Sequence, residues 1–216
     1  MLKTGKHSFT RAASLLIFLG SIAAPVHAAI IYDNGGPNIE NGWDIHDSNW
    51  SADDFSLAAN GTVKHVGFYL QSLEDISEWN QDIQYVIRAD NSGSPGVALA
   101  AGAGSNLTAV DSGLPWCCGG NAYLVTFNLQ SPFNATAATT YWLELTEATG
   151  GGFAFWVTAD ANGSYNGYNN VEGNSGQQFA FYLSDTASVP EPASLGLLGL
   201  GVTLLAAARR RLAVRT

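Results

Sequence analysis

The chain has 216 residues, a formal net charge of −9 and an apolar content of 46%, which excludes a chain disordered by composition. Residues 29–188 contain 17 acidic residues but only two basic ones, Lys64 and Arg88, and therefore carry a net charge of −15. Such a surface repels phosphate backbones and anionic lipid, which argues against nucleic-acid binding and favours cations, neutral sugars or cationic partners. Solubility of an exported protein is the simpler explanation of the same acidity.

Residues 1–28 have the three parts of a secretory signal peptide. Three basic residues precede an apolar run over 12–24, a proline follows it, and Val26 and Ala28 place small residues at the −3 and −1 positions that a signal peptidase reads. We expect cleavage between Ala28 and Ala29, which would place the remaining chain outside the cytoplasm. A retained membrane anchor is the alternative.

Short segments with β-type patterning fill the middle of the chain, and glycine-rich turns separate them. In 63–70, Val66, Phe68 and Leu70 define one face, and Val63 falls on the other face with His65, Gly67 and Tyr69. The pattern predicts one all-β domain over 29–188, an antiparallel β-sandwich or jelly roll. We expect strands at 30–32, 54–57, 63–70, 81–88, 97–101, 123–129, 140–145, 153–157 and 178–183.

The segment 44–54 is rich in oxygen ligands of the kind that calcium prefers. It matches neither the EF-hand loop nor a calcium-binding repeat, and its acids could equally be solvated loop residues or caps at the start of strands. A structural calcium ion is therefore a candidate cofactor, with Asp44, Asp47, Asp53 and Asp54 as its candidate ligands.

The six tryptophans fall into two groups. Trp142 and Trp156 lie within strand patterns, so we expect them in the core. The others lie in polar loops, where exposed rings beside amides and carboxylates are suited to stacking on sugar faces; plugs over the ends of the sandwich are the alternative. The candidate ligand-binding residues are Trp43, Trp50, Trp79, Trp116, Tyr165 and Tyr168.

The two cysteines, Cys117 and Cys118, are adjacent and flanked by turn-forming residues. In an oxidising periplasm such thiols do not stay reduced indefinitely. A strained disulfide between the two neighbours is one prediction, and an intermolecular bridge or a free pair are the alternatives. We expect no catalytic role for these cysteines.

Residues 189–216 form a separate tail. It opens on Val-Pro-Glu-Pro-Ala, continues as an apolar run over 193–208, and then turns basic. The run predicts a single, rather short transmembrane helix, and the arginines that follow it favour a cytoplasmic end. This topology places the middle domain outside.

The tail resembles the PEP-CTERM sorting domain of Gram-negative bacteria, through the Pro-Glu-Pro motif, the short Leu/Gly-rich span and the terminal arginines. The resemblance implies recognition by exosortase, a membrane-embedded peptidase or transpeptidase, and a route from the inner membrane to the cell surface or the extracellular space. It also implies a bacterium that secretes exopolysaccharide. Carried over by position, Pro190, Glu191 and Pro192 form the recognition motif, and Arg209, Arg210 and Arg211 form the stop. The order of segments in the middle is similar to an exported β-sandwich that often carries such tails.

These patterns predict a surface-sorted, non-enzymatic β-sandwich associated with an exopolysaccharide or biofilm matrix, with carbohydrate binding through loop aromatics. A secreted hydrolase acting on polysaccharide is the first alternative, and it would need two carboxylates at a set separation. A purely structural or adhesive surface protein is the second. No catalytic residue stands out.

Overall fold

The computed structural model describes residues 29–72, 76, 79–116, 119–147, 154–160 and 167–186. Over these residues the regular structure is β, in strands that pair antiparallel. The strands are β1 (Ile30–Asp33), β2 (Pro37–Asp44), β3 (Ser51–Ser56), β4 (Gly61–Ser72), β5 (Gln84–Asp90), β6 (Pro95–Ala103), β7 (Ser105–Pro115), β8 (Asn121–Ala135), β9 (Thr140–Thr146), β10 (Ala154–Ala159), β11 (Tyr168–Asn169), β12 (Gly173–Asn174), β13 (Gln178–Phe179) and β14 (Phe181–Ser184).

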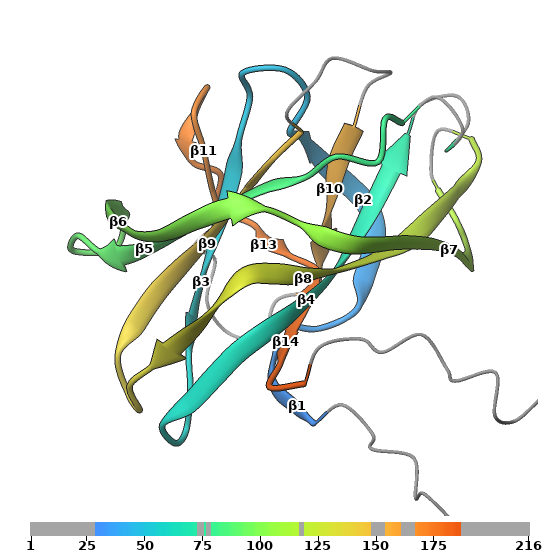
Figure 1. Ribbon diagram of the computed structural model, residues 1–216. Coiled ribbons are helices and arrows are strands. Elements are labelled where there is room, and N and C mark those ends of the chain that lie inside the picture. Colours follow the sequence, from blue (N-terminus) through green and yellow to red (C-terminus); the bar gives the residue numbers. More distant parts are fainter. Residues whose placement is uncertain are drawn as a thin grey trace, which may run out of the picture.

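The strands form two sheets that pack against each other (Figure 1). The six-stranded sheet has the order β12-β11-β3-β9-β5-β6. The eight-stranded sheet has the path β1-β14-β4-β10-β13, while β2 pairs with β10, and β8 joins β4 to β7. The prediction of an all-β antiparallel fold is confirmed.

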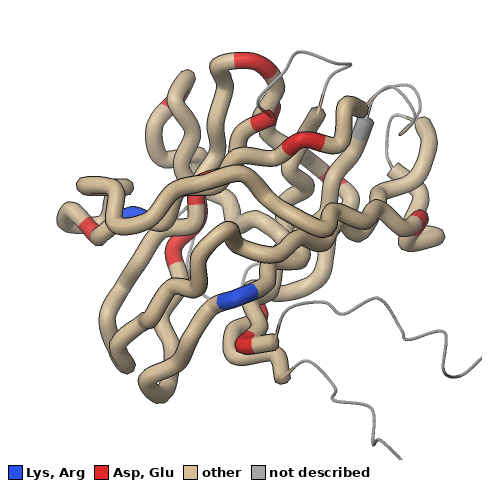
Figure 2. Tube along the Cα trace, in the orientation of Figure 1, with Lys and Arg blue, Asp and Glu red and all other residues tan. Residues whose placement is uncertain are grey.

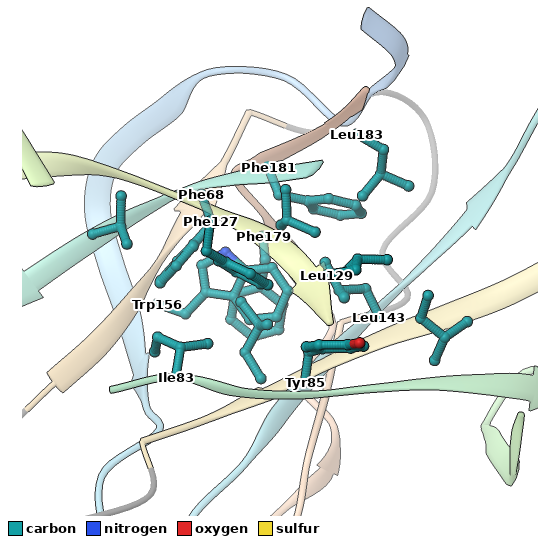
Figure 3. Packing of buried hydrophobic residues seen from close by; sticks show 14 of the residues in the cluster. Phe68, Ile83, Tyr85, Phe127, Leu129, Leu143, Trp156, Phe179, Phe181 and Leu183 are labelled. Atoms are coloured by element: carbon teal, nitrogen blue, oxygen red, sulfur yellow. The ribbon is translucent and has the colours of Figure 1, made fainter. Parts of the chain in front are cut away.

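Aromatic side chains dominate the core between the sheets (Figure 3). The indole of Trp156 stacks on Phe179 at a centroid distance of 4.7 Å and meets Phe68 edge to face at 6.1 Å. Tyr85 of the six-stranded sheet packs on Phe127 of the eight-stranded sheet at 6.0 Å. Such offset and edge-to-face pairs each stabilise by about 0.5–1.5 kcal/mol beyond the area they bury. Among the described residues, the core cluster runs from Ile45 to Leu183 in the sequence.

A register shift in β4 corrects the expected face of Val63. Between Val63 and His65 the pairing with β8 slips, which is the signature of a β-bulge. As a result Val63 is buried in the core together with Val66 and Phe68, whereas His65 remains on the outer face.

The expected strands all correspond to observed ones, but β2, β7 and the short β11 and β12 were not expected. In the sheet β2 pairs only with β10, and β7 pairs only with β8. Edge strands tolerate polar residues because one side remains solvated, and β2 and β7 are accordingly rich in Asn, Ser, Thr and Gly. This composition resembles that of a loop.

The first and last segments of the folded domain lie side by side, because the backbone N–H of Asp185 donates to the carbonyl of Ala29 at 3.3 Å. Both termini therefore leave the domain beside β1 and β14, at the end opposite the β2–β3 loop (Figure 1). Where the chain is described, it contains no helix long and apolar enough to cross a membrane. The expected signal peptide and the expected transmembrane helix over 193–208 lie outside the described residues.

Candidate functional site

Two of the expected ligand-binding aromatics lie together. Trp50 directly precedes β3, and Tyr168 begins β11, which pairs with β3 through Ala52. Their rings are nearly parallel, with centroids 6.0 Å apart and an interplanar angle of 10°. Both side chains are half-buried, so the pair offers ring surface at the side of the six-stranded sheet.

Asn170 holds this pair in place. Its Oδ1 accepts from the Trp50 backbone N–H at 3.1 Å, its own N–H donates to the Trp50 carbonyl at 3.3 Å, and its Nδ2 donates to the Ser48 carbonyl at 3.2 Å. The β2–β3 loop is thus tied to the turn after β11. We define the Trp50 surface as Trp50, Tyr168 and Asn170.

Trp142 packs against the Tyr168 ring of the Trp50 surface. It is 1% exposed, as expected for a buried tryptophan, but it lies on the outer face of the six-stranded sheet and not between the sheets. Its ring meets Tyr168 edge to face at 6.3 Å, and its Nε1 donates to Asp90 Oδ1 at 2.9 Å.

An ion pair between Arg88 and Glu144 lies beside Trp142 on the same face. Arg88 Nε donates to Glu144 Oε2 at 2.6 Å and its Nη2 donates to Oε1 at 3.0 Å, while its Nη1 donates to the Gly96 carbonyl at 3.2 Å. The hydrogen bonds to Glu144 raise the pKa of Arg88. The guanidinium retains N–H groups beyond these three bonds and is 26% exposed, so it can still donate to a ligand.

Trp43 and Trp116 lie on the eight-stranded sheet instead. Trp43 is half-buried against the core and donates from Nε1 to Gln177 Oε1 at 2.8 Å. Trp116 lies over β2, since a Cβ at Gly42 would be 3.3 Å from its Cη2. The structure therefore divides the expected aromatic set, because Trp50 and Tyr168 lie at the six-stranded sheet, Trp116 lies against β2 of the other sheet, and Trp43 packs toward the core.

Trp79 corrects another expectation. It was predicted to be an accessible loop aromatic, but it is 3% exposed and belongs to the core cluster with Ile45 and Ile83. Its ring cannot stack on a ligand without local opening of the loop that carries it.

The four aspartates expected to bind calcium have different environments. Asp53 is fully buried and accepts from Asn34 Nδ2 at 2.8 Å, from the Phe179 N–H at 2.6 Å and from the Asp54 N–H at 2.9 Å, so it connects β3 to the other sheet. Burial raises the pKa of Asp53 well above its ordinary value.

Both carboxylate oxygens of Asp44 accept hydrogen bonds from the loop that follows it, from the His46 N–H at 2.9 Å and from Asn49 Nδ2 at 2.8 Å. Asp47 is exposed, and its carboxylate lies 3.4 Å from His46 Nδ1. Among the residues that the structure describes, no three His, Cys, Asp or Glu side chains form a group able to hold a metal ion. The placement of the aspartates gives no support to the calcium prediction.

Glu147 is a feature that the sequence did not indicate. It follows β9 and is 0% exposed, and neither carboxylate oxygen makes a hydrogen bond of regular geometry. Burial raises the pKa of Glu147 to about 7, with a contribution from Asp82, whereas His46 and the nearby Asn80 amide lower it. This carboxylate is the main unsatisfied polar group at the end of the sandwich that carries the β2–β3 loop.

Several expected functional residues lie outside the described part of the chain. These are Ala28, Cys117, Cys118, Tyr165, Pro190, Glu191, Pro192, Arg209, Arg210 and Arg211. Ala29 is described and is exposed, next to the start of β1.

Comparison with known proteins identifies the tail. The model of the PEP-CTERM protein-sorting motif matches residues 188–211, which include the Pro-Glu-Pro sequence, the apolar run and the arginines. A search of curated proteins found no match. The matched segment begins two residues after the last described residue of the sandwich, so the sorting signal and the folded domain are separate parts of the chain. Residues 188–211 therefore carry a PEP-CTERM protein-sorting motif, which supports export of the chain and its sorting through the C-terminus.

Proposed function

We propose that the sandwich binds a polysaccharide of the extracellular matrix through the Trp50 surface, after exosortase-type processing has sorted it to the cell surface. The parallel, half-exposed pair of Trp50 and Tyr168, which Asn170 fixes, is the observation that carries this proposal. A pre-positioned ring pair loses little conformational entropy when it binds, which favours recognition of a ligand with an apolar face.

The chemistry of the surface suits a sugar. The C–H face of a pyranose ring can pack on the indole, while hydroxyl groups bond to polar atoms at the rim. Asn170 is exposed, and its amide keeps one N–H and one acceptor lone pair beyond the bonds that hold Trp50 and Ser48. Arg88 contributes further N–H groups along the same face.

The charge distribution favours a neutral polysaccharide. Lys64 and Arg88 are the basic residues of the domain, and acidic residues are spread over all of it (Figure 2). Because Arg88 is already paired with Glu144 in a bidentate geometry, it carries little uncompensated charge with which to attract a uronate or a sulfate.

Binding fits the described carboxylates better than hydrolysis does. A glycosidase needs an accessible acid with a raised pKa and a second carboxylate at a set distance. The two acids with raised pKa values, Asp53 and Glu147, are both fully buried, and Asp53 is committed to bonds between the sheets. Neither acid is therefore accessible to a bound polysaccharide, and Asp53 instead joins the two sheets.

A binding assay on residues 29–188 tests the proposal. The probes are exopolysaccharide from the producing bacterium, insoluble curdlan as a neutral polymer, and alginate as an anionic one. We expect the wild-type domain to bind a neutral polymer, and Trp50→Ala and Tyr168→Ala each to weaken binding roughly tenfold, the equivalent of about 1.4 kcal/mol.

Val171→Ser is the matched control, because Val171 is 73% exposed on the turn that follows Asn170 and has no role in the ring pair. Binding that is absent for all three polymers, or that is indifferent to loss of both rings, would leave a structural or adhesive role as the better explanation.

A further inference from the structure

Two glycines on the outer face of the eight-stranded sheet are covered by aromatic rings. Tyr182 of β14 pairs with Gly67 of β4, and the tip of its ring occupies the space that a side chain at position 67 would fill. Trp116 lies against Gly42 of β2, where a Cβ would be 3.3 Å from its Cη2. Tyr182 leans over the neighbouring strand β4, whereas Trp116, which follows β7, reaches across to β2.

Two more rings lie between these positions. Tyr69 follows Gly67 by two residues and therefore shares its face. Phe155 of β10 pairs with Gln71, which makes it a diagonal neighbour of Tyr69, and it also lies against Gly42, where a Cβ would be 3.0 Å from the Cβ of Phe155. We define the tyrosine strip as Tyr182, Tyr69, Phe155 and Trp116.

Side chains of the tyrosine strip are half-buried, so each presents part of its ring to solvent. Burial raises the pKa of Tyr182, and Tyr69 raises it further, which indicates that the two phenols lie close together. Burial and Asp33 likewise raise the pKa of Tyr69. In the described part of the chain neither phenol hydroxyl makes a hydrogen bond, so both remain available to an incoming polar group.

The length of the tyrosine strip and the charges beside it determine which kind of ligand fits it. β14 and β10 both pair with the edge of β4 opposite β8, at His65–Phe68 and at Leu70–Ser72. The strip therefore runs along β4 from Gly67 to Gln71, about 13 Å, and then across β10 to β2, two inter-strand spacings or about 9 Å. This length suits several linked sugar rings better than one small molecule. The charged residues in its register are Asp33, opposite Tyr182, and Asp44, opposite Phe155. Both are acidic, so an acidic polymer is disfavoured.

We propose that the tyrosine strip is a second contact surface for a neutral polysaccharide chain. It lies on the outer face of one sheet, whereas the Trp50 surface lies at the outer side of the other, so the two are on opposite sides of the sandwich. A domain with two such surfaces joins two polysaccharide chains and gains avidity when both engage the same network. The two surfaces share no residue, so the proposal for one can be wrong while the proposal for the other holds.

Hydroxyl-radical footprinting of wild-type residues 29–188 tests the strip without any substitution. The probe is curdlan or the producing bacterium's exopolysaccharide, whichever the domain binds more tightly in the binding assay. Alginate serves as the anionic comparison. We expect the polymer to protect Tyr69, Tyr182 and Trp116, and to leave the exposed Val110 of β7 unchanged. Rings that stay unprotected would overturn the proposal. Protection that rises with protein concentration alone would also overturn it, because the occupant would then be a second copy of the domain.

Variants separate this proposal from the Trp50 surface. Tyr69→Ala and Trp116→Ala should each weaken binding severalfold in a Trp50→Ala background, and should abolish the cross-linking of soluble polymer, measured by light scattering, in an otherwise wild-type domain. Tyr69→Phe keeps the ring and should retain cross-linking, and Val110→Ala is the control on the same sheet. Cross-linking that persists in both alanine variants contradicts the strip, whereas cross-linking lost only in Trp50→Ala contradicts it and leaves the Trp50 surface intact.

Discussion

The ring of Tyr182 takes the place of a side chain at Gly67 on the adjacent strand, since a Cβ there would overlap Cε1 and Cζ of the ring. Gly67→Ala should therefore displace the ring or the strand and destabilise the domain by about 1–3 kcal/mol, measured by urea unfolding. In a Tyr182→Ala background the cost should largely vanish. Gly36→Ala is the control, because nothing lies within 4 Å of a Cβ at that position. Equal costs in both backgrounds would contradict this arrangement.

Glu147 should make the domain less stable as the pH rises. Its folded pKa of about 7 exceeds the ordinary value of 4.5, so the folded state holds the proton more tightly than the unfolded state does. Stability is then greatest below about pH 4.5 and is lost as the pH rises through 7, by up to roughly 3 kcal/mol.

Urea unfolding at pH 5, 6, 7 and 8 checks this, with Glu147→Gln as the comparison. The glutamine variant remains neutral and should lack most of this loss. Parallel pH profiles for the two proteins would show that the Glu147 carboxyl is solvated. His46→Asn in both backgrounds removes the contribution of the neighbouring imidazole to the pKa of Glu147.

Asp53 should contribute to stability by joining the two sheets. Asp53→Ala removes the buried acceptor of the Phe179 N–H and of one of the two hydrogen bonds that Asn34 Nδ2 donates, and should cost about 2–4 kcal/mol. Asp53→Asn can still accept from both through its amide oxygen, and should cost less. Thermal and chemical unfolding of both variants measures the difference, and an alanine variant as stable as wild type would rule out this role.

Arg88→Lys should not be a conservative change. Lysine cannot reproduce the two parallel hydrogen bonds to Glu144, which is 6% exposed and would be left poorly paired. We expect a loss of about 1–3 kcal/mol, and a smaller loss for the double variant Arg88→Met/Glu144→Leu. Lys64→Met, at an exposed position, serves as the control. If Arg88→Lys and Lys64→Met behave alike, the ion pair adds nothing to stability.

The tail prediction concerns processing. Glu191→Ala alters the centre of the matched sorting motif and should leave the protein unprocessed in the membrane fraction of the producing bacterium. Mass spectrometry of the wild-type surface form should show a C-terminus that lacks Arg209–Arg211. A mature wild-type form that retains these arginines would refute the cleavage step.

The alternation of apolar and polar residues within strands was enough to predict an antiparallel all-β domain. The sorting tail could be recognised from the sequence because its three parts follow one another in a fixed linear order. Strands β2 and β7 were missed because edge strands carry polar residues that resemble loops. Val63 was placed on the wrong face because a bulge changes the alternation at a point that the neighbouring residues do not mark.

The candidate sites were predictable only in part. The polar surroundings of Trp50 and Tyr168 made them candidate ligand-binding residues, but did not indicate that β11 would pair with β3 and bring the rings together. The surroundings of Trp79 are equally polar, but the prediction of an exposed ring was wrong there, because Trp79 packs into the core. Nothing in the sequence marked Tyr182, because what distinguishes it is Gly67 on the neighbouring strand. Tyr69 was not marked either, since its proximity to Tyr182 arises only from the pairing of β14 with β4. Glu147 was indistinguishable from the other acids, since its burial arises only from tertiary packing.

The hydrogen bond between Asp185 and Ala29 has a mechanical consequence. A domain that holds a polymer near its β2–β3 loop and is tethered beyond Asp185 is pulled lengthwise, along β14. That strand is paired on both sides, with β1 and with β4, so the force is shared by two rows of hydrogen bonds that must break together. The pairing of β14 on both sides therefore lets the domain resist tension applied through its C-terminal end.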